Sequence, residues 1–173
     1  MSEQLSTALV TGGSRGIGKA IAETLAKAGY QVYLTYVSKA DEAEAVARNI
    51  VAAGGKACAF RLDVADAEAV AAFFKERIKD QVELDVLVNN AGISQIKLFT
   101  DITPEDWQHV MNVDLNGVYN MTHSVVRSMI NRKSGAIVNV SSVWGVYGGA
   151  CESAYSAAKA GVVGLTKALA REL

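Results

Sequence analysis

Short apolar runs alternate with segments of helical periodicity along this chain. The first run, 7–10, ends at a glycine-rich turn, and 17–28 then carries apolar residues at helical spacing before a glycine. The same strand, turn and helix unit recurs twice. The predicted strands are 7–10, 31–36, 57–62, 84–88 and 136–140, and the predicted helices are 17–28, 40–53, 65–79, a long one starting at 103–105 and a last one from about 153.

The predicted strands read as continuous apolar runs rather than as strict alternation. Parallel strands covered by helices on both faces require this pattern. Alternating units with right-handed crossovers predict a Rossmann-like, doubly wound α/β fold with strand order 3-2-1-4-5. Ligands are expected at the carboxyl ends of the strands, near the switch between strands 1 and 4. No linker divides the 173 residues, so we expect one domain over 1–173.

Composition and charge exclude several classes of function. The 17 basic and 18 acidic residues leave a formal net charge of -1, so no nucleic-acid partner is expected. Cys58 and Cys151 are far apart without metal-ligand spacing, and only His109 and His123 could supplement them, so neither a disulfide framework nor a metal site is predicted. The first residues, 1–4, do not resemble a signal peptide, and no long apolar stretch follows. The sequence therefore predicts a cytoplasmic protein without a membrane partner.

The first predicted strand runs into a glycine-rich turn, 11–18. Glycines permit a tight turn and close backbone approach, and the N-terminus of the next helix presents free N–H groups to an anion. The spacing is G-x-x-x-G-x-G rather than the commoner G-x-G-x-x-G, and such turns also occur merely to bring a helix close to its strand. We interpret the turn as a pyrophosphate site, with candidate contacts at Gly12, Ser14, Arg15, Gly16, Ile17 and Gly18.

The end of the second predicted strand bears on the choice between NAD and NADP. NAD-specific folds usually place an acidic residue there, whereas this chain has none at 36–38. Arg15 in the turn and Lys39 could meet a 2′-phosphate, so NADP is favoured, although Lys39 alone is more typical of a solvated charge. Asp63 and Val64 follow the third strand and are candidate adenine contacts, unless Asp63 instead caps the next helix.

Tyr155 and Lys159 form the most specific local pattern. Residues four apart share a helix face, which brings the phenol beside an ammonium. A nearby positive charge favours the phenolate, so Tyr155 is a candidate general acid. The Y-x-x-x-K pattern alone is frequent by chance, but Ser142 follows the fifth predicted strand at the same end of the sheet. The three side chains together predict a carbonyl site.

Five motifs now stand in order: TGGSRGIG at 11–18, Asp63-Val64, NNAG at 89–92, Ser142, and YSAAK at 155–159. From about residue 5 to 173 the chain resembles the short-chain dehydrogenase/reductase family, most narrowly the 3-oxoacyl-[acyl-carrier-protein] reductases of fatty acid biosynthesis. The resemblance implies NADPH-dependent reduction of a 3-oxoacyl thioester, bound to a carrier protein or CoA. It also implies that Tyr155 donates the proton, Lys159 binds the nicotinamide ribose, Ser142 orients the substrate and Asn90 contacts the cofactor.

The chain departs from the family pattern at Asp114. The family's fourth catalytic position is an asparagine in N-L-x-G, and the matching stretch here begins with Asp114. The asparagine holds, through backbone geometry in a helix kink, a water that relays protons to the lysine, a role that the backbone carbonyl oxygen of Asp114 could keep. An ionised carboxylate could also draw Lys159 away. Asn112, two positions earlier, points to another helix face and is a poor substitute.

The chain also stops inside its last predicted helix, where family members continue through further strands and a lid. We therefore expect a fragment, or a product that lacks its C-terminus, with the fifth strand as an open sheet edge. If the chain is the whole protein, we expect a partner or another copy to cover that edge. The resemblance implies a homodimer or tetramer. Two alternatives stay open: reduction of another small ketone or sugar, and a catalytically silent nucleotide-binding fragment.

Overall fold

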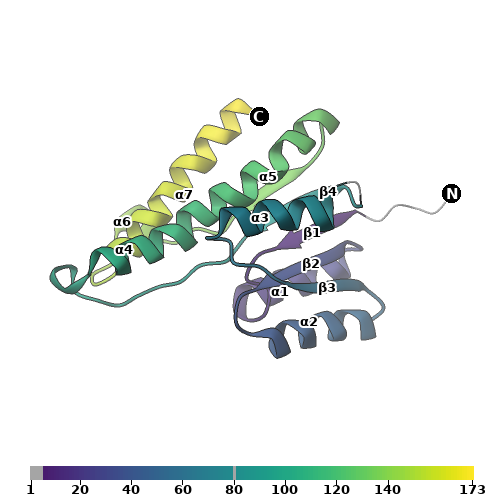
Figure 1. Ribbon diagram of the computed structural model, residues 1–173, viewed down its shortest axis with the longest axis horizontal. Coiled ribbons are helices and arrows are strands. Elements are labelled where there is room, and N and C mark those ends of the chain that lie inside the picture. The colour runs from purple at the N-terminus through teal and green to yellow at the C-terminus, as the bar shows by residue number, and fades with distance from the viewer. Residues whose placement is uncertain (1–5, 80) are drawn as a thin grey trace.

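Five parallel strands form one sheet in the order β3-β2-β1-β4-β5. The computed structural model describes residues 6–79 and 81–173 (Figure 1). The strands are β1 (Thr7–Val10), β2 (Gln31–Tyr36), β3 (Lys56–Arg61), β4 (Leu84–Asn89) and β5 (Ala136–Asn139). The predicted doubly wound α/β fold and its strand order are thus confirmed. Strands β2 and β3 lie on one side of β1, and β4 and β5 lie on the other, although all the strands are parallel. The boundary between β1 and β4 is therefore the switch point where ligands bind in such folds.

Helices cover both faces of the sheet. The bounds are α1 (Gly16–Lys27), α2 (Ala40–Ala52), α3 (Ala67–Phe73), α4 (Pro104–Met111), α5 (Gly117–Arg132), α6 (Trp144–Tyr147) and α7 (Ser153–Glu172). Two π-helical turns, η1 (Phe74–Ile78) and η3 (Asn112–Asn116), and one 3₁₀ turn, η2 (Phe99–Asp101), complete the described elements. The helices α1 and α2 supply the core on one face, and α3 and α5 supply it on the other.

Strand β1 explains why the predicted strands read as unbroken apolar runs. Leu9 belongs to the core shared with α3 and α5, whereas Val10 belongs to the core shared with α1 and α2. Successive side chains of a strand point to opposite faces, and here both faces are covered. Both residues are fully buried, which is worth about 1.5–3 kcal/mol for each such side chain. The core therefore fixes the strand from which the glycine-rich turn departs.

The predicted helix boundaries were wrong at two places. The helix predicted over 65–79 begins at Ala67, because the Asp66 carboxylate, rather than that of Asp63, caps it by accepting a hydrogen bond from the Ala69 N–H at 2.9 Å. The long helix predicted from 103–105 begins at Pro104 behind a capping box of Thr103 and Asp106, but η3 interrupts it. The other predicted boundaries match the structure or differ from it by one residue.

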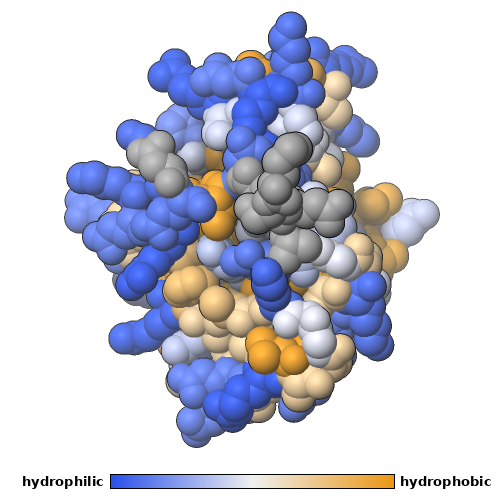
Figure 2. Space-filling model, turned by 90° about the vertical axis from the view of Figure 1, so that its right-hand side faces the viewer, coloured by the Kyte–Doolittle hydropathy of each residue, from blue (hydrophilic) through white to orange (hydrophobic). Residues whose placement is uncertain are grey.

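Strand β5 is an open edge of the described sheet, as expected. It pairs only with β4 among the described strands, and its Val138 side chain is 49% exposed. An apolar groove runs between α5, β5 and α7, lined among others by Met129, Ile137 and Leu169. On the side of the molecule shown in Figure 2, hydrophilic residues lie mainly around the edges, and apolar residues are exposed across the lower part of the view. No helix of the described residues is long and apolar enough to cross a membrane.

Candidate active site

The turn after β1 needs its glycines for steric reasons. Gly12 has φ +66°, a left-handed conformation that side chains other than glycine rarely adopt. A Cβ on Gly18 would lie 2.2 Å from the Gly12 carbonyl oxygen, so no side chain fits there. The turn is thereby pressed against the first turn of α1, as the pyrophosphate interpretation requires.

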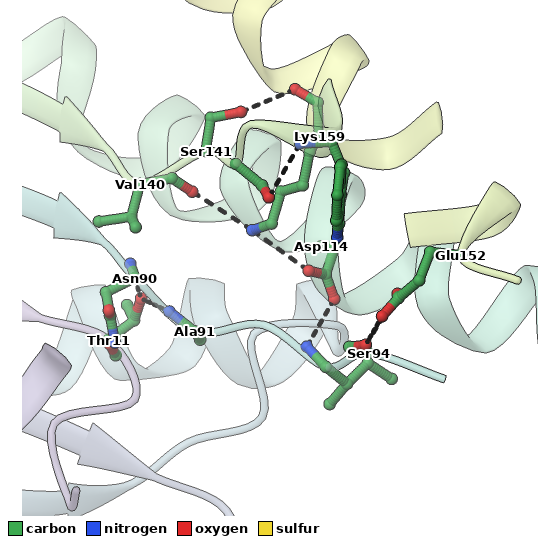
Figure 3. A network of polar contacts seen from close by, with 12 residues as sticks. Thr11, Asn90, Ala91, Ser94, Asp114, Val140, Ser141, Glu152 and Lys159 are labelled. Atoms are coloured by element: carbon green, nitrogen blue, oxygen red, sulfur yellow. Dashed lines mark hydrogen bonds and ion pairs between the residues drawn. The ribbon is translucent and has the colours of Figure 1, made fainter. Parts of the chain in front are cut away.

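Asn90 and Thr11 fasten this turn to the end of β4. The Thr11 hydroxyl oxygen accepts hydrogen bonds from the N–H groups of Asn90 and Ala91, at 3.0 and 2.9 Å. The Asn90 side-chain amide donates to the carbonyl oxygens of Thr11 and Gly12, at 2.9 and 3.2 Å. Figure 3 shows Thr11, Asn90 and Ala91 together at the ends of their strands. Asn90 therefore shapes the turn directly, beside the cofactor contact that the resemblance implies.

The start of α1 has features of an anion site. Arg15 is the N-cap residue, its side chain makes no capping hydrogen bond, and no acidic residue occupies the first turn. The first N–H groups of a helix lack intrahelical partners and carry partial positive charge. Arg15 and Ile17 are exposed and Ser14 is half-buried, so all three border the same surface as Gly12 and Gly16. The structure thus brings the predicted turn residues together at one helix N-terminus.

The ends of β2 and β3 border this surface. Lys39 forms an exposed ion pair with Glu42 at 3.5 Å, which favours the interpretation of Lys39 as a solvated charge. Asp63 is exposed, and one of its carboxylate oxygens accepts a hydrogen bond from the Ala65 N–H at 3.0 Å. Val64 is buried, and its carbonyl oxygen accepts from the Asn120 side chain at 2.9 Å. Asp63 is thus the more available of the two candidate adenine contacts.

The three predicted catalytic side chains come from the end of β5 and from α7. Ser142 follows β5, and its Oγ accepts a hydrogen bond from the Trp144 N–H at 3.2 Å. The Lys159 Nζ lies 5.5 Å from the centre of the Tyr155 ring. The adjacent Ser141 hydroxyl donates to the Lys159 carbonyl oxygen at 3.0 Å, which ties the end of β5 to α7. The predicted pairing of Tyr155 with Lys159 on one helix face is present.

Asp114 makes a buried ion pair with Lys159. The Lys159 Nζ lies 3.2 Å from Asp114 Oδ2 and donates to the Val140 carbonyl oxygen at 3.3 Å, while the Ile93 N–H donates to Asp114 Oδ1 at 2.8 Å (Figure 3). The Asp114 and Lys159 side chains are 0% and 4% exposed. Burial raises the pKa of Asp114, against the opposing effects of the Ile93 N–H and the Lys159 ammonium. The ammonium is therefore already held by a carboxylate inside the protein.

A π-helical turn and a glycine make room for this pair. Asp114 lies in η3, where the wider turn interrupts the helix that runs from α4 to α5. A Cβ on Gly92 would lie 2.7 Å from Asp114 Oδ2 and 3.2 Å from the Lys159 Nζ. The NNAG motif thus brings its backbone up against both charged groups. Asn112 instead bonds to Gln108 and Asn116 on the exposed side, which agrees with its placement on another helix face.

Comparisons with known proteins agree with this geometry. The model of the short chain dehydrogenase family matches residues 6–173. The chain belongs to the short-chain dehydrogenases. A 3-oxoacyl-[acyl-carrier-protein] reductase of Staphylococcus aureus is 46% identical over 167 residues, which are 96% of this chain and 68% of the relative. An acetoacetyl-CoA reductase of Paracoccus denitrificans is 47% identical over 165 residues, 95% of this chain and 66% of the relative.

A solved structure extends the likeness to three dimensions. It is a metagenomic short-chain oxidoreductase in complex with NADP, with TM-score 0.94 and 38% identity, and the match covers 100% of this chain and 78% of that one. Membership confirms the family and the oxidoreductase class predicted from the sequence. The chain spans about two thirds of the length of the curated relatives named above.

Several groups of this short-chain dehydrogenase site escaped prediction from the sequence. The Ile93 N–H and the Val140 carbonyl are backbone groups, so residue type carries no signal for them. Ser141 differs in this respect, because a second serine directly after a predicted strand is visible in the sequence. Gly92 was visible as part of NNAG, but its contact with a charged pair became visible only in the fold.

Proposed function

We propose that this chain reduces the 3-keto group of a 3-oxoacyl thioester with NADPH, giving the 3-hydroxyacyl product. The observation that carries the proposal is the pair of Tyr155 and Lys159 on α7, which the hydrogen bond from Ser141 to Lys159 ties to the segment after β5 that carries Ser142. Relatives at 46–47% identity that are named as reductases of 3-oxoacyl-carrier-protein and acetoacetyl-CoA support this substrate class.

The residues at the end of β1 fit a dinucleotide. The exposed and uncapped start of α1, at Arg15 and Gly16, leaves backbone N–H groups accessible to a pyrophosphate. No carboxylate stands at 36–38, where β2 ends, and Arg15 is exposed, which favours a 2′-phosphate over a free ribose hydroxyl. The bound NADP of a similar structure supports the same choice. When bound, NADPH would supply the hydride of the reduction.

The chain's own residues then handle the proton and the orientation of the substrate. Tyr155 donates its phenolic proton to the carbonyl oxygen, which becomes the hydroxyl oxygen of the product. The Ser142 hydroxyl donates a hydrogen bond to the same oxygen and fixes the carbonyl relative to Tyr155. The Lys159 ammonium lies 5.5 Å from the centre of the Tyr155 ring, so its positive charge faces the group that gives up the proton. Lys159 also belongs to the cofactor contacts that we propose, with Asn90 and Tyr155.

Asp114 completes the proposed catalytic group by holding Lys159. The carboxylate and the Val140 carbonyl fix the ammonium from two sides. The backbone carbonyl oxygen of Asp114 would still accept a hydrogen bond from a proton-relaying water, as the backbone of the asparagine does in the family. The carboxylate differs from an amide by its charge, so the relay acquires a dependence on pH that an amide does not give.

Assembly into a homodimer or tetramer forms part of the proposal. On α5 the Tyr119 and Ile130 side chains are each 54% exposed, and Tyr119 stacks on His123. On α7, Ala157 and Ala160 are exposed small residues that allow close approach of another helix. Scattering at several concentrations measures the mass of the particle, and a monodisperse monomer would contradict the assembly.

Tyr155→Phe tests the proposed reaction. The variant removes one hydroxyl, and we expect the rate of NADPH oxidation with an acetoacetyl thioester to fall by about 10²–10⁴. Tyr30→Phe is the matched control, because this tyrosine directly precedes β2 at the end of the sheet opposite the site, and it should retain the wild-type rate. Equal rates in all three proteins would remove Tyr155 from the mechanism.

A fluorescence titration with NADPH and NADH separates the main alternatives. Saturable binding that favours NADPH, with turnover of another ketone or a sugar in place of the thioester, would keep the site and change the substrate. Nucleotide binding without turnover of any carbonyl compound would identify the chain as a silent nucleotide-binding fragment. Absence of nucleotide binding would contradict the proposed cofactor.

A further inference from the structure

The Glu152 carboxylate lies beside the proposed catalytic residues but has no role in the reduction as proposed above. It precedes Tyr155 by three residues and Lys159 by seven. The Ser156 N–H donates to the Glu152 carbonyl oxygen at 2.8 Å, so helical hydrogen bonding already begins at Glu152. Residues separated by three and by seven lie on one face of a helix. Glu152 therefore stands one turn before Tyr155 on the face that carries the site.

Ser94 holds the Glu152 side chain in place. Both carboxylate oxygens lie within hydrogen-bonding distance of the Ser94 Oγ, at 2.9 and 2.8 Å (Figure 3). Ser94 directly follows Ile93, whose N–H binds Asp114. A second link joins the same segments, because the Lys97 N–H donates to the Cys151 carbonyl oxygen at 2.8 Å. The segment after NNAG is thus closed against the start of α7, with Glu152 bound one residue after the N–H that binds Asp114.

The charge of Glu152 has no cationic partner among the described residues. Within residues 6–79 and 81–173, none of the ion pairs includes Glu152, and the nearby Lys97 is paired with Asp106. The Ser94 hydroxyl donates a hydrogen bond but carries no compensating charge. The N-terminal end of α7 favours a negative charge at this position. A persistent negative potential therefore marks this side of the approach to Tyr155.

We infer that Glu152 is a specificity-determining residue that selects substrates by charge, favouring neutral 3-oxo esters and thioesters over anionic 3-oxo acids. The inference rests on the proposed function. In a thioester or ester the group two carbons from the reacting ketone is neutral, whereas a free 3-oxo acid carries a carboxylate there. Glu152 repels that carboxylate through partly solvated space, where each unit charge at several ångströms changes the binding constant by about three- to tenfold.

Kinetics with two small substrates test the selection. Ethyl acetoacetate is neutral and acetoacetate is anionic, and the two share the reacting ketone. Glu152→Gln keeps an oxygen that accepts from Ser94 and removes the charge. We expect the ratio of kcat/KM for acetoacetate to that for ethyl acetoacetate to rise about three- to tenfold in E152Q. Added salt should raise the wild-type ratio toward that of the variant.

Two control variants separate charge from structure. Ser94→Ala removes the hydroxyl and keeps the carboxylate, so the substrate ratio should stay near the wild-type value even if both rates fall. Glu68→Gln removes an exposed charge from α3, away from α7, and should not change the ratio. A ratio that is unchanged in E152Q, or one that changes as much in E68Q, would overturn the inference.

Thiol chemistry measures the same potential without turnover. Cys151 adjoins Glu152, and in a Cys58→Ser background it becomes the only cysteine. We expect E152Q to raise the rate at which Cys151 reacts with an anionic aromatic disulfide, relative to its rate with a neutral dipyridyl disulfide, by several-fold. The ratio of the two rates is used because any change in the thiolate fraction of Cys151 cancels in it. A shift in the ratio of the two thiol reaction rates, without turnover of ethyl acetoacetate or acetoacetate, would support the negative potential at Glu152 and contradict the proposed function. Turnover without a shift in either ratio would overturn the charge selection alone.

Discussion

The two halves of the candidate site are held together by different kinds of contact. At the end of β1, the contacts join backbone groups, one hydroxyl and one side-chain amide, from Thr11, Gly12 and Asn90. At the start of α7, the contacts depend on ionised groups, above all Asp114 with Lys159. Groups of the first kind do not titrate near neutral pH, whereas carboxylates change state with pH. The proposed cofactor half should therefore be sensitive to added atoms, and the proposed substrate half to charge.

Gly18→Ala should have the largest effect, because it adds one methyl group to the cofactor half. The new Cβ would lie 2.2 Å from the Gly12 carbonyl oxygen, so the turn has to move. Overpacking of this kind costs about 1–3 kcal/mol of stability, and displacement of the turn should weaken NADPH binding at least tenfold. Fluorescence titration and urea unfolding measure the two quantities.

Gly164→Ala is the control for this change. Gly164 is an exposed helical glycine of α7, and a Cβ there meets nothing within 4 Å. The substitution should stabilise the protein by about 0.5–1 kcal/mol and leave NADPH binding unchanged. If G18A binds NADPH as tightly as G164A does, the steric account of the cofactor half is wrong.

The cofactor half was also the part best predicted from the sequence. Its strands, its order in the sheet and its glycine-rich turn follow from local patterns, since a buried run and a left-handed glycine both appear in the residue types. Ser142, Tyr155 and Lys159 were predictable for a related reason. One spacing places two of them on a helix face, and the rule for parallel sheets places the third at the same edge.

The contacts around Asp114 could not be predicted in the same way. Apolar periodicity does not distinguish an α-helix from one interrupted by a single wider turn, so η3 was read as continuous helix. The partners of Asp114 on Ile93 and Lys159 come from segments that meet only in the folded chain. Asp63 and Asp66 illustrate the same limit locally, since aspartate is a common helix cap and only the fold shows which of the two caps α3.

Asp114→Asn tests the sensitivity of the substrate half to pH. Burial raises the pKa of Asp114, so the folded protein binds more protons than the unfolded chain between the unfolded value of about 3.9 and the raised folded value. Stability from this group is present below that window and is lost as pH rises through it, by at most about 1.4 kcal/mol per pH unit. The amide does not titrate.

Urea unfolding from pH 4 upward measures this effect. The free energy of unfolding of the wild type should fall relative to that of D114N as pH rises, and the pH profile of kcat should lose the inflection due to Asp114. Glu105→Gln, an exposed change on α4, should follow the wild type at every pH. Parallel stability curves for wild type and D114N would show that the carboxylate is not perturbed by burial.

Asp106→Asn should have the smallest effect, and one of opposite sign with pH. Hydrogen bonds from Gln95 and Lys97 and from the Thr103 N–H hold the pKa of Asp106 well below its usual range. A depressed pKa contributes stability above the unfolded value of about 3.9, and that stability is lost as pH falls toward the folded value. D106N should therefore unfold at lower urea than the wild type at pH 7, and the difference should narrow below about pH 4.

Asp101→Asn provides the comparison for this last change. Asp101 is exposed and accepts a side-chain hydrogen bond only from its neighbour Thr100 among the described contacts, so its substitution should leave the urea midpoint unchanged at both pH values. The Lys97–Asp106 contact ties the segment that carries Ser94 to α4, so D106N should also lower kcat/KM for the thioester more than it lowers NADPH affinity. An equal loss in both quantities would mean that the two halves of the site do not respond separately.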